Sequence, residues 1–264
     1  VREILQLQPS VNVPSVAVHP DTYDQPAVAA LTFCADSASQ ILPWINMDVM
    51  PQSIIKLPNY GSTRLVDSTL TLTASGSGIQ SEADHFQFAF QRLIDNGSII
   101  TKFSSLDEVN GNCQAGIMLR ENGKQNSRFV MLSVSAAKGL RFFTRDSTGS
   151  VIKTLAVDPA VNSFPLWLKI SRNENTFYAS VSTNGTNWTV KDSVSAGLNR
   201  DLLAGVAASS ADLSATTTAV FEKTRIVQGN IKPILRISSP GNPTIGYIAP
   251  ANVTISGSAF DMDG

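Results

Sequence analysis

The sequence predicts an all-β fold: a two-sheet antiparallel jelly-roll sandwich with flanking fragments at both ends. Three observations lead to this prediction. Apolar and polar residues alternate along short runs, turn signals separate the runs at spacings of about ten residues, and no long helical pattern interrupts them. Alternation with a period of two gives each strand one apolar face, which is typical of antiparallel sheets packed face to face.

The alternating runs give the expected strands in chain order. The apolar residues predicted to face the core are Leu70 and Leu72; Phe86, Phe88 and Phe90; Ile117 and Leu119; Val130, Leu132 and Val134; Leu166, Leu168 and Ile170; and Phe177, Ala179 and Val181. Roughly a dozen strands fit into residues 41–228, which is too many for an immunoglobulin sandwich and suits a jelly roll.

Short turn signals lie between these runs. They are Asp95-Asn96-Gly97, Asn110-Gly111-Asn112, Glu121-Asn122-Gly123, Ala137-Lys138-Gly139, Ser147-Thr148-Gly149 and Asn184-Gly185. Glycine and asparagine supply the positive φ that tight hairpin turns need, so these segments are predicted to connect neighbouring strands.

Composition and charge exclude two classes of partner. The chain has 264 residues and a net charge of −1, from 20 Lys and Arg against 21 Asp and Glu. Nucleic-acid-binding proteins normally carry a basic excess, so no nucleic-acid partner is expected. No apolar run approaches the ~18 residues of a membrane-spanning helix, so no membrane insertion is expected in this segment.

The ends of the sequence predict pieces of neighbouring domains in a longer polypeptide. Residues 1–40, which open with the apolar spacing of a short helical turn, are expected to be the tail of a preceding domain and a connector. Residues 41–228 are expected to form the jelly-roll domain. Residues 229–264 are expected to be a linker and the first strands of a new repeat.

Several segments resemble, in the same order, the concanavalin A-like jelly-roll module of large secreted bacterial proteins. They are residues 81–88 (SEADHFQF), 97–100 (GSII), 115–121 (AGIMLRE), 167–172 (WLKISR) and 177–188 (FYASVSTNGTNW). The resemblance covers about 41–228. It implies a lectin-like sandwich that serves as an appended module of a multidomain extracellular or cell-surface protein, of bacterial origin.

The C-terminal segment from Pro233 resembles the start of a bacterial immunoglobulin-like repeat, and Val1–Gln8 is similar to the helix that closes a laminin G-like domain. Asp261 and Asp263, two residues apart before a glycine, have the spacing of Ca²⁺ ligands. The resemblance implies a structural Ca²⁺ ion at the domain junction, to which other residues would have to contribute oxygen ligands.

A sugar-binding surface needs aromatic faces together with planar polar groups. Residues opposite the apolar strand faces offer both, and the candidate ligand-binding residues are Gln87, Arg120, Trp167, Lys169 and Tyr178. The alternative is an ordinary polar outer face, in which aromatic residues reflect β-propensity. The segment 182–188 resembles an Asp-box hairpin, and the favoured interpretation is a structural turn with a buried indole.

The sequence argues against catalysis. Glu82 and Asp84 are two apart on an extended stretch, but Phe86 and Gln87 occupy the positions where jelly-roll glucanases carry their second glutamate. Retaining glycosidases need two carboxylates about 5 Å apart, so the pair is incomplete. Of the two histidines, His85 is expected to point away from the core. No nucleophilic triad and no catalytic metal cluster is predicted.

Two cysteines, Cys34 and Cys113, are too few for a disulfide scaffold. They could form one bridge, which would close a loop of roughly 80 residues and contribute about 4 kcal/mol in the chain-entropy model. The other interpretation is two buried free thiols.

Two functions remain. The first is a non-catalytic extracellular carbohydrate-binding or adhesion module that holds a polysaccharide or glycoconjugate. The alternative is a structural spacer or assembly domain of an extracellular stalk or fibre, which contacts neighbouring domains of the same long chain and has no ligand of its own. An exposed aromatic surface would favour the first.

Overall fold

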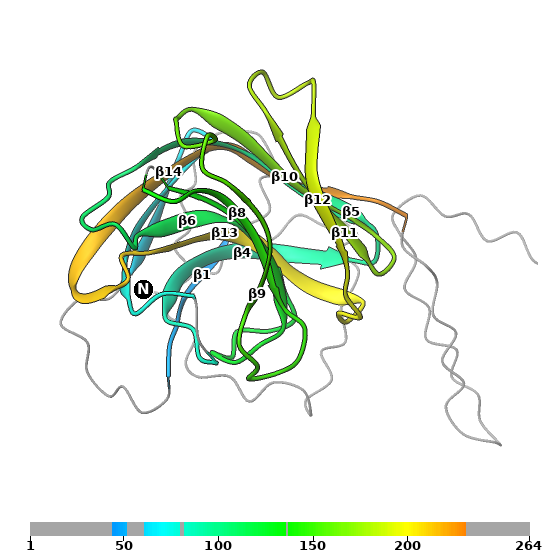
Figure 1. The fold of residues 1–264 in the computed structure, drawn as a ribbon, viewed down its shortest axis with the longest axis horizontal. Coiled ribbons are helices and arrows are strands. Elements are labelled where there is room, and N and C mark those ends of the chain that lie inside the picture. Colours follow the sequence, from blue (N-terminus) through cyan, green and yellow to red (C-terminus); the bar gives the residue numbers. More distant parts are fainter. Residues whose placement is uncertain (1–43, 52–60, 80–81, 136, 231–264) are drawn as a thin grey trace, which may run out of the picture. The chain divides into compact units, whose positions relative to one another are not determined.

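The computed structural model describes residues 44–51, 61–79, 82–135 and 137–230. Within these ranges all regular elements are β-strands, fourteen in number. They form two antiparallel sheets of seven strands each, which face each other as the layers of a sandwich (Figure 1). The predicted all-β jelly-roll sandwich is confirmed.

Each sheet combines strands from distant parts of the chain. Sheet A has the order β1 (Ile45–Val49), β4 (Phe86–Ile94), β13 (Asp201–Ser209), β6 (Gln114–Arg120), β7 (Phe129–Ser135), β8 (Gly139–Arg145), β9 (Lys153–Asp158). Sheet B has the order β12 (Thr189–Ser195), β11 (Thr176–Ser182), β10 (Leu166–Asn173), β5 (Gly97–Leu106), β14 (Asp212–Gln228), β3 (Thr69–Gly76), β2 (Ser62–Val66). β13 lies between β4 and β6 in sheet A, and β14 lies between β5 and β3 in sheet B. The last two strands of the domain therefore complete the hydrogen bonding of both sheets.

The predicted turn signals lie in the links between strands, as expected. Asp95 and Asn96 connect β4 to β5, and the segment 121–128 connects β6 to β7. Gly139 and Gly185 adopt φ values of 67° and 76°, which side chains other than glycine rarely tolerate. The local turn chemistry therefore fixes where the strands end.

The main core lies between the two sheets and contains most of the predicted apolar residues. Sheet B contributes Leu70, Leu72, Leu168, Ile170, Phe177 and Phe103, and sheet A contributes Ile117, Leu119, Val130, Leu132 and Val134. Phe103 stacks on Phe221 with ring centroids 4.7 Å apart. The alternation along β3, β6, β7, β10 and β11 predicted these faces correctly.

The phenylalanines of β4 lie on the other side of sheet A, and here the prediction is wrong. Ala89 and Leu93 of β4 face the main core, whereas Phe86, Phe88 and Phe90 belong to a second apolar cluster on the outer face of sheet A. The second cluster consists of Val49, Ile79, Phe86, Phe88, Phe90, Met118, Phe129, Met131, Phe143 and Ala207. Sheet A therefore carries buried apolar residues on both of its faces.

The expectations for the two ends fall almost entirely outside the described residues. Residues 1–40 and 231–264 are not described, so the helical turn, the immunoglobulin-like repeat and the domain boundaries stay predictions. Within the part of the chain that the structure describes, no helix has the length and apolarity needed to cross a membrane.

His85 is buried rather than directed away from the core as the sequence predicted. It pairs with Gly78 in an isolated bridge just before β4, and its Nδ1 has no hydrogen-bond partner among the described residues. Burial lowers the pKa of its imidazole below the usual 6.5. The folded protein therefore disfavours the charged form.

We expect the free energy of unfolding to fall as the pH is lowered from 7.5 to 5.5. The depressed pKa means that the unfolded chain binds more protons below about pH 6.5, so the stability is complete above that pH and decreases below it. Urea unfolding at the two pH values measures the change. In His85→Asn the free energy of unfolding should fall less between the two pH values. If it falls as much as in the parent chain, groups other than His85 cause the pH dependence.

Candidate functional site

The outer face of sheet B, which points away from sheet A, holds three of the predicted ligand-binding residues. Trp167 and Lys169 lie on β10 and Tyr178 lies on β11, and the residues that alternate with them face the main core. The register places Lys169 opposite Ser180 and Tyr178 opposite Ser171. All three side chains are half-buried, so part of each remains accessible.

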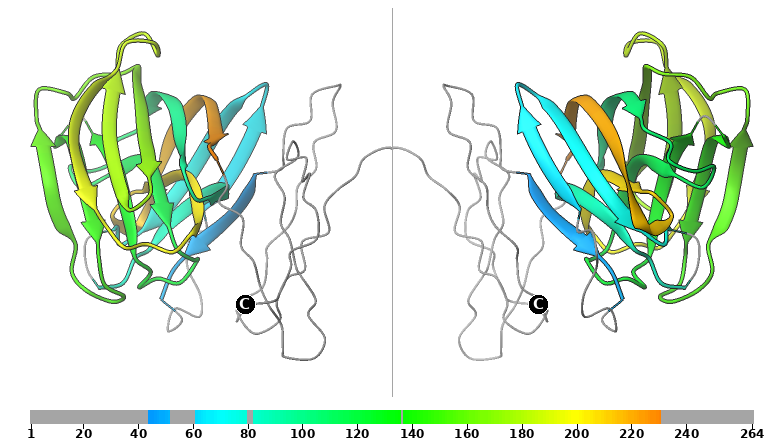
Figure 2. Two further views of the ribbon diagram at one scale, coloured as in Figure 1. Left: turned by 90° about the vertical axis from the view of Figure 1, so that its right-hand side faces the viewer. Right: turned by 90° about the vertical axis from the view of Figure 1, so that its left-hand side faces the viewer.

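The hairpin between β11 and β12 extends this face beyond the neighbouring strands (Figure 2). Ser182 Oγ accepts hydrogen bonds from the backbone N–H groups of Asn184 and Gly185, and Asn184 Oδ1 accepts two further backbone N–H groups, each at 2.9 Å. A Cβ at Gly185 would lie 2.7 Å from the Trp167 ring. These contacts show that side chains of the hairpin stabilise its own turn.

Trp188 completes the surface, although it is half-buried rather than buried. The Lys169 Nζ lies 4.3 Å from the centroid of the Trp188 ring, which is a cation–π contact. Burial lowers the pKa of the Lys169 ammonium group. We call the group Trp167, Lys169, Tyr178 and Trp188 the aromatic surface.

Charged and hydroxyl groups border the aromatic surface on β5 and β14. Lys102, opposite Trp167, forms an ion pair of 3.0 Å with Glu222, and Ser104 donates a hydrogen bond to the same carboxylate. The bonds from Ser104 and Lys102 lower the pKa of Glu222, so it is ionised near neutral pH. Aromatic rings can stack on the C–H faces of a sugar, and the charged and hydroxyl groups beside them can form hydrogen bonds with its hydroxyls.

Gln87 does not belong to this surface, so the expectation of one platform formed by all five residues is wrong. Gln87 lies on β4 in sheet A and is buried, because its face of β4 points toward sheet B. With its amide oriented to satisfy both ends, it accepts a bond from Thr63 Oγ1 and donates to Asp48 Oδ1 at 2.8 Å. Its role in the structure is to join β1, β2 and β4.

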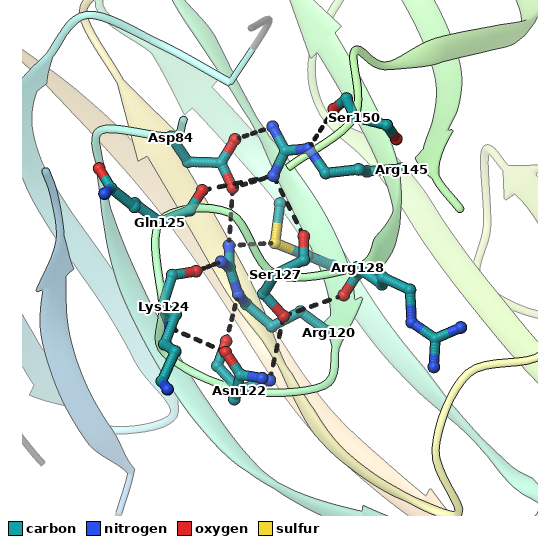
Figure 3. Close-up of polar contacts among 10 residues, drawn as sticks. Asp84, Arg120, Asn122, Lys124, Gln125, Ser127, Arg128, Arg145 and Ser150 are labelled. Atoms are coloured by element: carbon teal, nitrogen blue, oxygen red, sulfur yellow. Dashed lines mark hydrogen bonds and ion pairs between the residues drawn. The ribbon is translucent and has the colours of Figure 1, made fainter. Parts of the chain in front are cut away.

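Arg120 is likewise buried in sheet A, at the centre of an ionic cluster (Figure 3). Its Nη1 lies 3.3 Å from Asp84 Oδ2, and Arg145 binds both oxygens of Asp84 at 2.7 and 2.8 Å. All three side chains are fully buried. One carboxylate therefore neutralises only one of two guanidinium charges.

Backbone carbonyl groups stabilise the remaining charge. Arg120 donates to the carbonyl oxygens of Asn122 and Lys124, and Arg145 donates to those of Ser127 and Ser150 (Figure 3). Burial is the main cause that lowers the pKa of Arg120 to about 10, which still leaves it charged at neutral pH. The cluster fixes the β6–β7 loop onto β8. It was missed at the sequence level because its members are up to 61 residues apart.

A polar hollow of about 350 Å³ lies beside the β4–β5 and β10–β11 turns. It is lined by Asp95, Asn96, Arg172, Glu174, Asn175, Leu198 and Arg200. Arg200 forms an ion pair of 2.7 Å with Asp95, and Arg172 donates to the carbonyl oxygens of Glu174 and Asn199. These bonds connect the turns to the segment before β13, which is a structural role.

The predicted metal and disulfide residues are only partly described. Asp261, Asp263 and Cys34 lie outside the described residues. Cys113 is a buried free thiol whose Sγ lies 3.4 Å from the carbonyl oxygen of Ser210. Over the described ranges, no three His, Cys, Asp or Glu side chains gather into a group that could hold a metal ion.

The comparisons with known proteins show the fold. No family model matches the chain, and no curated protein matches it. A functionally unknown protein from Saccharomyces cerevisiae superposes with a TM-score of 0.52 at 14% identity, over 71% of this chain and 97% of the other. At this identity the likeness concerns the fold alone.

Two proteins with stated functions superpose with lower TM-scores. A carbohydrate-binding module from Bacillus subtilis has a TM-score of 0.47 at 13% identity, over 69% of this chain and 95% of the module. A xylan β-1,4-xylosidase from Bacillus halodurans has a TM-score of 0.43 at 16% identity, over 61% of this chain and 37% of the enzyme. The two-sheet sandwich is shown by the strand order itself, and the function rests on the site.

Proposed function

We propose that the jelly-roll domain is a non-catalytic carbohydrate-binding or adhesion module whose ligand is a polysaccharide or glycoconjugate. The observation that carries this proposal is the aromatic surface. Two indole rings and one phenol ring are partly accessible on β10, β11 and the β11–β12 link, next to Lys169 and the Lys102–Glu222 pair. Stacking on rings and hydrogen bonding to charged groups is how proteins recognise sugars.

The state of the two carboxylates supports a binding role over a hydrolytic one. Asp84 is fully buried and its two oxygens are held by Arg120 and Arg145, so it is not placed to act as a nucleophile or proton donor toward a ligand. Glu82 is exposed, and β4 offers it no second carboxylate as a catalytic partner, because Phe86 and Gln87 occupy the positions where that glutamate would be expected. A glycoside hydrolase needs two carboxylates facing one bond.

The resemblance to modules of secreted proteins extends the proposal to an extracellular or cell-surface location. One aromatic surface gives weak binding, which repetition along a multidomain chain would strengthen. Neighbouring domains of that chain are then the second class of partner. A structural Ca²⁺ ion at Asp261 and Asp263 belongs to the same proposal.

A binding assay of the full 264-residue chain on a glycan array and on insoluble polysaccharides, with and without Ca²⁺, tests the function. We expect binding that weakens about tenfold in Trp167→Ala and in Tyr178→Ala, since loss of about 1.4 kcal/mol is a factor of ten. Thr71→Ala is the matched control, because Thr71 lies on the outer face of the same sheet, three strands from β10.

The possible results separate the two functions. Binding that survives both aromatic substitutions would place the ligand elsewhere on the domain. If no polysaccharide binds in either condition while thermal unfolding shows a folded chain, the carbohydrate-binding proposal fails. The spacer role in an extracellular stalk or fibre then becomes the better account.

A further inference from the structure

A short polar row crosses the outer face of sheet A, on the opposite layer from the aromatic surface. Gln114, Ser133 and Arg141 lie on the adjacent strands β6, β7 and β8, on the face that also carries Met118, Met131 and Phe143 of the second cluster. Ser133 is directly opposite Arg141 on one side and Gly116 on the other. Gln114 is two residues before Gly116 on β6, so it is a diagonal neighbour of Ser133 on the same sheet face, at a typical spacing of about 7 to 8 Å.

The amide of Gln114 has no hydrogen-bond partner. The residue is only 4% exposed, and neither its Oε1 nor its Nε2 is bonded to any described group. Buried amides are normally paired, as Gln87 is in the same sheet. Because both atoms are unpaired, exchanging the oxygen and nitrogen of the amide does not satisfy it. One donor and one acceptor are therefore available to a ligand.

Arg141 is a half-buried cation whose charge has no partner among the described residues. Its guanidinium lies 5.2 Å from the centroid of the Phe143 ring, and none of the ion pairs of the described chain includes it. The neighbouring Arg120 and Arg145 share Asp84 instead. Burial removes water from the Arg141 guanidinium and so lowers its pKa. No carboxylate of the described residues forms an ion pair with it to compensate for this desolvation.

The unpaired Arg141 guanidinium and Gln114 amide indicate which chemical groups a ligand would need. A planar guanidinium pairs best with an oxyanion through two parallel hydrogen bonds. An amide that offers both a donor and an acceptor suits a hydroxyl group.

We propose that Arg141, Ser133 and Gln114 form a second ligand site, which binds the oxyanion and an adjacent hydroxyl of an acidic sugar. The oxyanion, a carboxylate or a sulfate ester, pairs with Arg141, whose partly exposed side gives access from solvent. The hydroxyl reaches Ser133 and the amide of Gln114. The site is separate from the aromatic surface and does not depend on the function proposed for it.

Calorimetric titration of the full chain with glucuronate, glucose 6-sulfate and glucose tests the site. We expect at least one of the two acidic sugars to bind and glucose to bind at least tenfold more weakly. The affinity should fall at least tenfold in Arg141→Gln and in Gln114→Leu. Arg64→Gln, which removes an exposed arginine of β2, and Trp167→Ala should leave it unchanged. Thermal unfolding verifies that each variant is folded.

The outcomes are distinct. Preference for glucuronate or for the sulfate ester identifies the oxyanion and supports the site. Equal binding to Arg141→Gln and the parent chain overturns it. Absence of binding by both acidic sugars also overturns it, and an ordered water on Gln114 in a crystal structure would then be the partner. If binding falls only in Trp167→Ala, the acidic sugar belongs to the aromatic surface, which retains the proposed function and rejects this site.

Discussion

Replacing Asp84 with asparagine is expected to lower the free energy of unfolding by about 3 to 5 kcal/mol. The substitution keeps the size of the side chain but removes the negative charge that Arg120 and Arg145 share in a fully buried environment. Two guanidinium groups would then lie next to each other without a counter-charge. Urea unfolding of the full chain, monitored by tryptophan fluorescence, measures the loss.

An exposed ion pair of the same sheet provides the control. Arg92 and Asp201 pair at the surface, with about two fifths of each side chain accessible. Because water already solvates both charges, Asp201→Asn should change the stability by less than about 1 kcal/mol. Similar small losses for the two substitutions would mean that the Asp84 cluster is hydrated in solution.

Replacing Phe88 with alanine is expected to cost about 3 to 5 kcal/mol, as much as a substitution in the main core. Phe88 is fully buried on the outer face of sheet A and stacks on Phe90 with ring centroids 5.0 Å apart. A face open to solvent would lose far less. The same unfolding measurement therefore decides whether the second apolar cluster is covered in solution.

Two further variants calibrate the result. Phe103→Ala removes a ring from the main core, where Phe103 contacts Phe221 and Phe164. Val151→Ala removes methyl groups from an exposed side chain and should stay within about 0.5 kcal/mol. A loss in Phe88→Ala that matches Val151→Ala rather than Phe103→Ala would contradict burial of the outer face.

The sequence by itself determined the fold class, most strand faces and the turns. Alternation along β10, for example, requires Leu168 and Ile170 on one side and Trp167 and Lys169 on the other. This holds because the side-chain period of a strand is two, whatever the strand pairs with. Turn chemistry is equally local, which is why the Asn184-Gly185 turn was predicted correctly.

Only the tertiary structure decided which face of β4 meets the other sheet. Phe86, Phe88 and Phe90 form the more apolar side, yet Ala89 and Leu93 face the main core. When both faces of a strand are buried, alternation no longer distinguishes inside from outside. The larger side chains occupy the outer cluster, while small Ala89 lies between the sheets.

The candidate sites divide in the same way. Trp167, Lys169 and Tyr178 were chosen from the sequence because they alternate with apolar residues, and β10 and β11 pair directly, so the three lie on one face. The placement of Gln87 and Arg120 in the other sheet depends on strand order, and the isolation of Gln114 and Arg141 depends on which groups surround them. Sequence periodicity reveals a strand and its apolar face, and local turn residues reveal where the strand ends. It cannot reveal a residue's exposure or its hydrogen-bond partners, because long-range contacts determine both.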